Sequence, residues 1–268
     1  MSEIAAVIFD WAGTMVDFGS RAPMGAFVEA YRRFGVEISI SEAREPMGLP
    51  KRDHIAALMA EPEIAARWQA AHGKIPNEAE IDALYDTFVP LNAGVVTDFA
   101  ELIPGALEVV KACRASGIKI GSTTGYVRPI MERLLPAAAA QGYAPDNLVC
   151  AGDLAEGRPS PLMMFRCFAD LGVYPPYKVV KIDDKVPGIA EGRAAGTWTV
   201  GVAISGNCVG LSLPEWHALS PAEQQSHRQS ATATLGEAGA DYVIDSVANL
   251  LPVLETITQR LASGERPA

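Results

Sequence analysis

Residues 5–14 read Ala5-Ala6-Val7-Ile8-Phe9-Asp10-Trp11-Ala12-Gly13-Thr14, and this stretch decides the fold. The unbroken apolar run before Asp10 is typical of a strand that is buried on both faces, as strands are in a parallel sheet. A single carboxylate follows the run, at the carboxyl end of the strand, where open parallel sheets bind their ligands. The segment therefore predicts a parallel α/β sheet with a functional site at Asp10.

The second half of the chain alternates between predicted strands and predicted helices. Apolar runs predict strands at 118–122, 147–151, 179–184, 197–203 and 241–245, with helical patterns between them and after the last strand. Such alternation is typical of a doubly wound, Rossmann-like parallel sheet. A polar segment at about 205–235 interrupts the alternation, and we expect it to form a helical excursion.

The segment between the first strand and residue 100 has a different pattern. Gly25 to Phe34 shows apolar residues at helical spacing, and Pro50 precedes a second helical run that starts with Lys51. No strand pattern is evident across this segment. We therefore expect an α/β core made of residues 1–20 and 100–268, with an inserted α-helical cap domain at 21–99.

The composition limits the classes of partner that the protein can bind. The formal net charge of −10 argues against nucleic acid and anionic membranes, because both are bound by basic surfaces. No apolar run approaches the ~20 residues that span a bilayer. The start of the chain lacks a signal-peptide pattern, and the four scattered cysteines are typical of a reducing compartment. We expect a cytoplasmic protein with a small-molecule substrate.

Four predicted strand ends, or the loops after them, carry polar groups that suit phosphoryl transfer. Besides Asp10 they are Ser122-Thr123-Thr124, Arg158 and the pair Asp183-Asp184. A carboxylate can attack phosphorus, hydroxyls and a cation can hold its oxygens, and paired carboxylates can bind Mg²⁺. Each group alone is more often a helix cap, a turn residue or a surface charge. Their occurrence in this order at one sheet edge favours a phosphoryl site.

These motifs resemble the haloacid dehalogenase superfamily, whose members carry a cap domain inserted after the first strand. Within it, the match narrows to the phosphonoacetaldehyde hydrolase (phosphonatase) branch and runs from about residue 4 to 260. The segments that carry this resemblance are Asp10-Trp11-Ala12-Gly13-Thr14, Pro46-Met47-Gly48-Leu49-Pro50-Lys51, Gly121-Ser122-Thr123-Thr124-Gly125-Tyr126, Gly157-Arg158-Pro159 and Gly196-Thr197-Trp198-Thr199-Val200.

The resemblance implies hydrolysis of the P–C bond of phosphonoacetaldehyde to acetaldehyde and phosphate. It implies that Asp10 is the nucleophile that becomes an aspartyl phosphate, and that Lys51 forms a Schiff base with the aldehyde. It implies Mg²⁺ bound by Asp10, the backbone carbonyl of Ala12 and Asp184, and a homodimer built through the caps. The predicted substrate and phosphoryl contacts are Thr124, Ser122, Arg158, Met47, His54 and Tyr126.

The chemistry of the residues agrees with these roles. Cleavage of a P–C bond needs an electron sink, which a protonated imine on Lys51 supplies. A lysine at the first turn of a helix has a lowered pKa, because the positive end of the helix dipole disfavours the ammonium. His54 lies three residues further on the same helix face, where it could relay protons. Ala12 replaces the acid of related phosphatases, and an enamine leaving group needs no such acid.

Three residues depart from the superfamily pattern or add charge near the site. Gly188 stands where many members have a further Asp, and we expect Asp183 to compensate. Lys185 comes directly after Asp184 and is expected to weaken Mg²⁺ binding unless it points away. Arg21 is a further cation that is expected near the site if its segment faces inward.

Two alternative functions stay open at this point. One is a phosphomonoesterase or a haloacid dehalogenase on the same scaffold. Ala12 disfavours the esterase, whereas Arg158 and the acidic pair disfavour the metal-independent dehalogenase. The other is a catalytically inactive binding protein, in which Lys51 would be an ordinary surface lysine.

Overall fold

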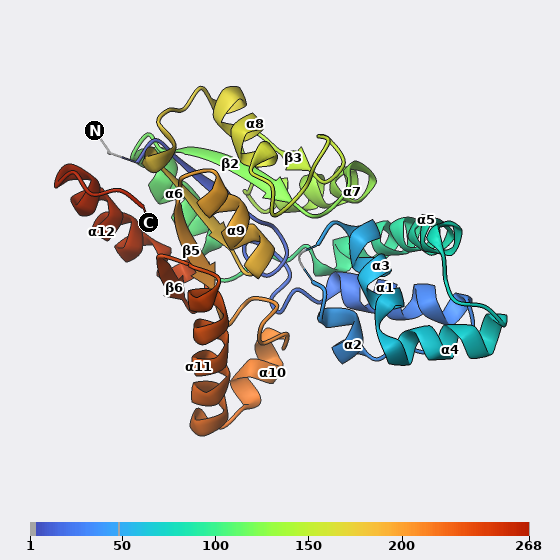
Figure 1. The fold of residues 1–268 in the computed structure, drawn as a ribbon. Helices are drawn as coiled ribbons and strands as arrows, with labels where there is room; N and C mark the ends of the chain where they lie inside the picture. The colour runs from blue at the N-terminus through green and yellow to red at the C-terminus, as the bar shows by residue number, and fades with distance from the viewer. Residues whose placement is uncertain (1–3, 48, 268) are drawn as a thin grey trace.

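The computed structural model describes residues 4–47 and 49–267 and contains one six-stranded sheet (Figure 1). Every pair of neighbouring strands is parallel, and the order is β3-β2-β1-β4-β5-β6. The chain leaves β1 toward β2 and β3 and later returns beside β1 with β4, so the topological switch point lies between β1 and β4. This confirms the predicted doubly wound fold. The strands are β1 (Ala6–Phe9), β2 (Lys119–Thr124), β3 (Val149–Cys150), β4 (Val179–Asp183), β5 (Trp198–Val202) and β6 (Tyr242–Ile244).

Helices cover both faces of the sheet. Val7 and Phe9 of β1 belong to the hydrophobic cluster on one face of the sheet, whereas Ala6 and Ile8 belong to the cluster on the opposite face. This two-sided burial is why β1 reads as an unbroken apolar run. On the first face lie α6 (Ala106–Ala115), α7 (Arg128–Ala139) and α12 (Leu250–Ala262); on the other lie α8 (Leu162–Leu171), α9 (Val186–Ala194) and α11 (Pro221–Glu237).

A helical lobe comes after β1 in the sequence and projects from the sheet, at the right of Figure 1. Its own hydrophobic cluster includes Phe27, Tyr31, Trp68 and Phe88, which are fully buried. The division of the chain into a core and a cap at residues 21–99 stays a prediction. The helices of this lobe are α1 (Ala22–Arg33), α2 (Ile40–Arg44), α3 (Lys51–Ala60), α4 (Pro62–His72) and α5 (Glu78–Val95).

The expected excursion near 205–235 is helical. It consists of α10 (Leu213–Ala218) and α11, which begin with capping boxes formed by Ser212 and Ser220. Short 3₁₀ turns at Val96–Phe99, Pro176–Lys178 and Val247–Asn249 complete the connections. Within residues 4–47 and 49–267, no helix is both long and apolar enough to cross a membrane. Gly48, a member of one quoted motif, lies outside the described residues.

Candidate active site

Asp10 lies at the carboxyl end of β1, beside the switch point of the sheet. The loop after it is a tight turn, in which the carbonyl of Trp11 accepts hydrogen bonds from the backbone N–H groups of residues 14–16. Gly13 has a φ of +85°, and a Cβ there would lie 2.3 Å from Oδ2 of Asp184. Glycine is therefore required at this position, both for the left-handed backbone and for the approach of the two strand ends.

A buried arginine pairs with the carboxylate of Asp10. Nη2 of Arg158 lies 2.9 Å from Oδ1 of Asp10 and 3.2 Å from Oδ2 of Asp183. Burial alone would raise the pKa of Asp10, but Arg158 and Lys185 outweigh it and hold the pKa well below its usual range. Asp10 is thus anionic at neutral pH, as a nucleophile must be, and a cation is in place for phosphoryl oxygens.

Sequence reasoning missed the network that holds Arg158 from behind. Nε of Arg158 lies 3.1 Å from Oε2 of Glu191, which also accepts a 2.9 Å hydrogen bond from the hydroxyl of Thr123. Lys181 donates to the same hydroxyl at 2.7 Å and is fully buried in β4. The sequence did offer one signal for this network: Lys181 lies within an apolar strand, and a buried charge requires a partner. Glu191 gave no comparable signal.

Three carboxylates form a candidate metal centre. One oxygen each of Asp10, Asp183 and Asp184 lies within 4.8 Å of the others, and all three side chains are buried. Among the described residues, Oδ2 of Asp10 finds no hydrogen-bond partner. Hard carboxylate oxygen donors of this kind fit a divalent cation such as Mg²⁺.

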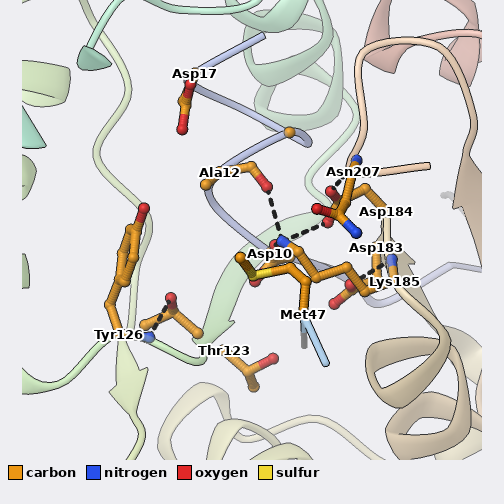
Figure 2. Close-up of polar contacts among 12 residues, drawn as sticks. Asp10, Ala12, Asp17, Met47, Thr123, Tyr126, Asp183, Asp184, Lys185 and Asn207 are labelled. Carbon is orange, nitrogen blue, oxygen red and sulfur yellow. Dashed lines mark hydrogen bonds and ion pairs between the residues drawn. The ribbon is translucent and has the colours of Figure 1, made fainter. Parts of the chain in front are cut away.

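Lys185 enters the same cluster of oxygens (Figure 2). Its Nζ lies 2.9 Å from Oδ1 of Asp184, 3.2 Å from the carbonyl oxygen of Ala12 and 3.6 Å from Oδ2 of Asp10. Burial alone would lower the pKa of Lys185, but Asp184 and Asp10 raise it above the usual value, so the side chain is an ammonium. The side chain therefore points inward, toward the predicted metal ligands.

The structure also explains the glycine at position 188. A Cβ on Gly188 would lie 2.0 Å from Cγ of Asp183, which means that the carboxylate of Asp183 fills the space next to this position. A side chain at 188 is therefore incompatible with Asp183 in its present place. This arrangement supports the expectation that Asp183 compensates for the missing Asp.

Lys51 is the first residue of α3, and its side chain is buried under the helical lobe. Nζ lies 3.5 Å from the sulfur of Met47, and 5.6 and 5.8 Å from the ring centroids of Phe27 and Tyr126. Burial first, and then the charge of Lys185, lower the pKa of Lys51 to about 7. A large fraction of the amine is thus neutral at neutral pH, as attack on a carbonyl requires.

Lys51 and Asp10 line one small cavity between the lobe and the sheet. The cavity has a volume of about 310 Å³ when its mouth and the adjoining open space are counted, so its enclosed part is small. It brings together most of the predicted site residues: Asp10, Ala12, Met47, Lys51, Thr124, Tyr126 and Arg158. Ser20, Pro23, Leu49, Gly125 and Lys185 also line it, and sequence reasoning did not assign them to the substrate site.

Among the described residues, the predicted metal ligand Asp184 and two predicted substrate contacts, Ser122 and His54, do not line the cavity. The hydroxyl of Ser122 accepts a hydrogen bond from Nε1 of Trp11. Nε2 of His54 lies 2.9 Å from the carbonyl oxygen of Ala43, and its ring stacks on Phe27 at 4.1 Å. Burial and the charge of Lys51 lower the pKa of His54 to about 3, so the ring is neutral. The substrate roles of both residues stay predictions.

Arg21 does not face the site, contrary to expectation. Its side chain is partly exposed and lies 3.9 Å from the carboxylate of Glu215, on the surface. The nearby Asp17 takes the inward direction instead, because its carboxylate accepts hydrogen bonds from the backbone N–H groups of Arg21 and Ala22 at the start of α1.

Comparison with known proteins identifies the family. The family model described as haloacid dehalogenase-like hydrolase matches residues 4–196. A phosphonoacetaldehyde hydrolase from Paraburkholderia phytofirmans is 54% identical over 267 residues, which cover 100% of both chains. Another from Aeromonas hydrophila is 51% identical and is matched over 99% of this chain and 96% of its own. The chain belongs to the phosphonoacetaldehyde hydrolase family.

A solved structure agrees with this membership. The crystal structure of a phosphonoacetaldehyde hydrolase-like protein from Oleispira antarctica matches with a TM-score of 0.97 and 47% identity, over 99% of this chain and 96% of that one. The resemblance drawn from the motifs is therefore confirmed for the phosphonoacetaldehyde hydrolase family. The roles of single residues are not settled by membership of the family and depend on the geometry of this cavity.

Proposed function

We propose that the protein hydrolyses phosphonoacetaldehyde to acetaldehyde and phosphate through an imine on Lys51 and an aspartyl phosphate on Asp10. One observation carries this proposal: a buried amine with a pKa of about 7 lines the same small cavity as an anionic carboxylate. The curated relatives named phosphonoacetaldehyde hydrolase, which match over the whole chain, support the reaction.

The first stage is condensation of Lys51 with the aldehyde. The neutral amine attacks the carbonyl carbon, water leaves, and the protonated imine lies one carbon away from the P–C bond. Met47 and Tyr126 surround the nitrogen and exclude bulk water from it. The imine supplies the electron sink that the carbon leaving group lacks on its own.

The second stage is transfer of the phosphoryl group. A carboxylate oxygen of Asp10 attacks phosphorus, the P–C bond breaks, and its electron pair moves onto the imine to give an enamine. Arg158 stabilises the equatorial oxygens, since its guanidinium lies 2.9 Å from the attacking carboxylate. Thr124 also lines this end of the cavity. No oxygen leaving group is formed, which is consistent with Ala12 in place of an acid.

Two water molecules complete the turnover. The enamine takes a proton on carbon, and water hydrolyses the resulting imine to acetaldehyde and free Lys51. A second water attacks the aspartyl phosphate, which releases phosphate and restores Asp10. The water consumed in these two steps, less the one lost on imine formation, balances the overall hydrolysis.

Mg²⁺ is the cofactor that we propose for the carboxylate cluster. Asp10, Asp184 and the carbonyl of Ala12 would hold it, with Asp183 nearby. When bound, the ion supplies positive charge that reduces the repulsion between an anionic nucleophile and an anionic phosphoryl group. The ammonium of Lys185 lies among the same oxygens and would compete with the ion for them.

We further propose that residues 21–99 act as a cap over the cavity and that two chains associate through their caps. Ile40 and Ile75, with exposed fractions of 48% and 69%, are single exposed apolar side chains on this lobe and permit such a contact. Light scattering after size-exclusion chromatography tests the homodimer, and a monomeric mass would contradict it. A cytoplasmic location stays a prediction.

Release of both products from phosphonoacetaldehyde tests the proposed reaction. We expect acetaldehyde and phosphate in a 1:1 ratio, and no turnover in Asp10→Asn or Lys51→Ala. Faster turnover of a panel of phosphate monoesters would favour the phosphomonoesterase instead. Absence of both products would favour a binding protein, and a Lys51→Ala variant with unchanged rate would contradict the imine step.

A further inference from the structure

The position of the Lys185 ammonium relative to the proposed metal ligands carries an inference about this chain in particular. Its Nζ contacts Oδ1 of Asp184 at 2.9 Å and the carbonyl of Ala12 at 3.2 Å, and lies 3.6 Å from Oδ2 of Asp10. These groups are the same three that are proposed to hold Mg²⁺. Figure 2 shows the side chain of Lys185 reaching across to the loop that carries Ala12.

The residues that carry these oxygens, or their neighbours in the chain, make supporting contacts that do not involve Lys185. Oδ2 of Asp184 accepts a 2.8 Å hydrogen bond from the backbone N–H of Asn207, which leaves Oδ1 for a cation. The next carbonyl after Ala12, that of Gly13, accepts a 2.9 Å hydrogen bond from the hydroxyl of Ser205. These contacts preorganise the oxygen cluster, and we expect its geometry to be kept when a neutral side chain replaces Lys185.

A divalent ion bound here would share its oxygens with this ammonium. Mg²⁺ binds oxygen at about 2.0–2.1 Å in near-octahedral geometry, and the ammonium now occupies hydrogen-bonding positions on two of the same oxygens. The two cations would also repel each other strongly in a site where all the side chains are buried. Lys185 is only 7% exposed and lines the cavity, so the cavity is the space into which the ammonium can turn when the ion binds.

We propose that Lys185 competes with Mg²⁺ for the oxygens of Asp10, Ala12 and Asp184, and that it acts as a built-in cation there when the metal is absent. In that state the ammonium offsets the charge of Asp10 and Asp184. Metal affinity in this protein is then set by a lysine outside the ligand set. This inference rests on the proposed function, because that function defines the metal ligands.

The test is a calorimetric titration of the metal-free protein with MgCl₂, without substrate. In Lys185→Met the stem of the side chain is retained and the charge is lost, and we expect Mg²⁺ to bind at least about tenfold more tightly than in the parent protein. Lys111→Met is the matched control, since Lys111 is an exposed lysine on α6, and it should leave the affinity unchanged. Equal or weaker Mg²⁺ binding in Lys185→Met would overturn the proposal.

A second variant guards against a folding defect. Lys185→Gln keeps a polar group that can hydrogen bond to Ala12 and Asp184 while it removes the charge, and the same gain in Mg²⁺ affinity is expected. Circular dichroism establishes that each variant is folded before the titration. Because no substrate is present, failure of this inference is distinct from failure of the proposed reaction, which is judged by product release from phosphonoacetaldehyde.

Discussion

Replacing Lys51 by Met removes the amine while it keeps the length of the side chain, and we expect an inactive protein that is more stable than the parent. The pKa of Lys51 falls from its usual 10.5 to about 7, mainly because the side chain is buried. One pKa unit corresponds to about 1.4 kcal/mol, so protonated Lys51 destabilises the native state by up to about 5 kcal/mol.

The pH dependence of this gain is set by the direction of the shift. Below pH 7 both the native and the unfolded chain bind the proton, so the full cost falls on the native state. Between pH 7 and 10.5 only the unfolded chain binds it, and the stability of the parent protein therefore rises with pH. The open mouth of the cavity reduces the effect, and we expect a gain in Lys51→Met of about 2–4 kcal/mol near pH 6 that vanishes near pH 10.5.

Urea unfolding followed by circular dichroism measures this difference. The parent protein, Lys51→Met and the control Lys111→Met should be compared at about pH 6, 8 and 10. Lys111 is exposed, so its replacement should change the free energy of unfolding by less than about 0.5 kcal/mol at each pH. If Lys51→Met is no more stable than the parent near pH 6, or if its gain does not shrink with pH, the reasoning about the buried amine is refuted.

The geometry of the site leads to three further predictions. Imine formation with phosphonoacetaldehyde needs the neutral amine, so its rate, measured by rapid quenching, should rise with pH to half its maximum near the Lys51 pKa of about 7; a midpoint above pH 9 would contradict this. Gly13→Ala should lower kcat for phosphate release by at least about 100-fold, since the new Cβ would lie 2.3 Å from Oδ2 of Asp184, and activity within about twofold would contradict the argument. Nη1 of Arg44, at the end of α2, donates a 2.9 Å hydrogen bond to Oδ1 of Asn207, so Arg44→Met should raise KM several-fold and make the helical lobe more sensitive to limited proteolysis. An unchanged KM and cleavage pattern would show that this contact does not hold the lobe closed.

Much of the fold could be predicted because apolar runs mark buried strands. The prediction was least accurate at the strand expected over 147–151, which is observed only at Val149–Cys150. Side chains explain the difference: Oδ2 of Asp146 and Oδ1 of Asn147 accept hydrogen bonds from the backbone N–H groups of Ile120 and Ser122 in β2. These side chains take the place of ladder partners, and apolar pattern alone does not reveal such replacements.

The candidate site was predictable where its residues end strands, and less so where burial decides orientation. Asp10 comes after an apolar run, so its place at the sheet edge could be inferred from the pattern. The inward direction of Lys185 could not, because it depends on the loop at Ala12 and Asp184 coming together in three dimensions. His54 shares a helix with Lys51, yet its ring is fixed by Phe27 of α1 and Ala43 of α2, which the spacing along one helix does not reveal.

Borohydride reduction in the presence of phosphonoacetaldehyde, combined with peptide mass spectrometry, is the decisive measurement for the imine on Lys51. We expect one alkylated lysine, at Lys51, in the parent protein and also in Asp10→Asn, where the imine forms but phosphorus is not captured. Absence of an adduct in a folded protein, or an adduct on a lysine other than Lys51, would contradict the claim that a buried amine of the helical lobe activates the substrate.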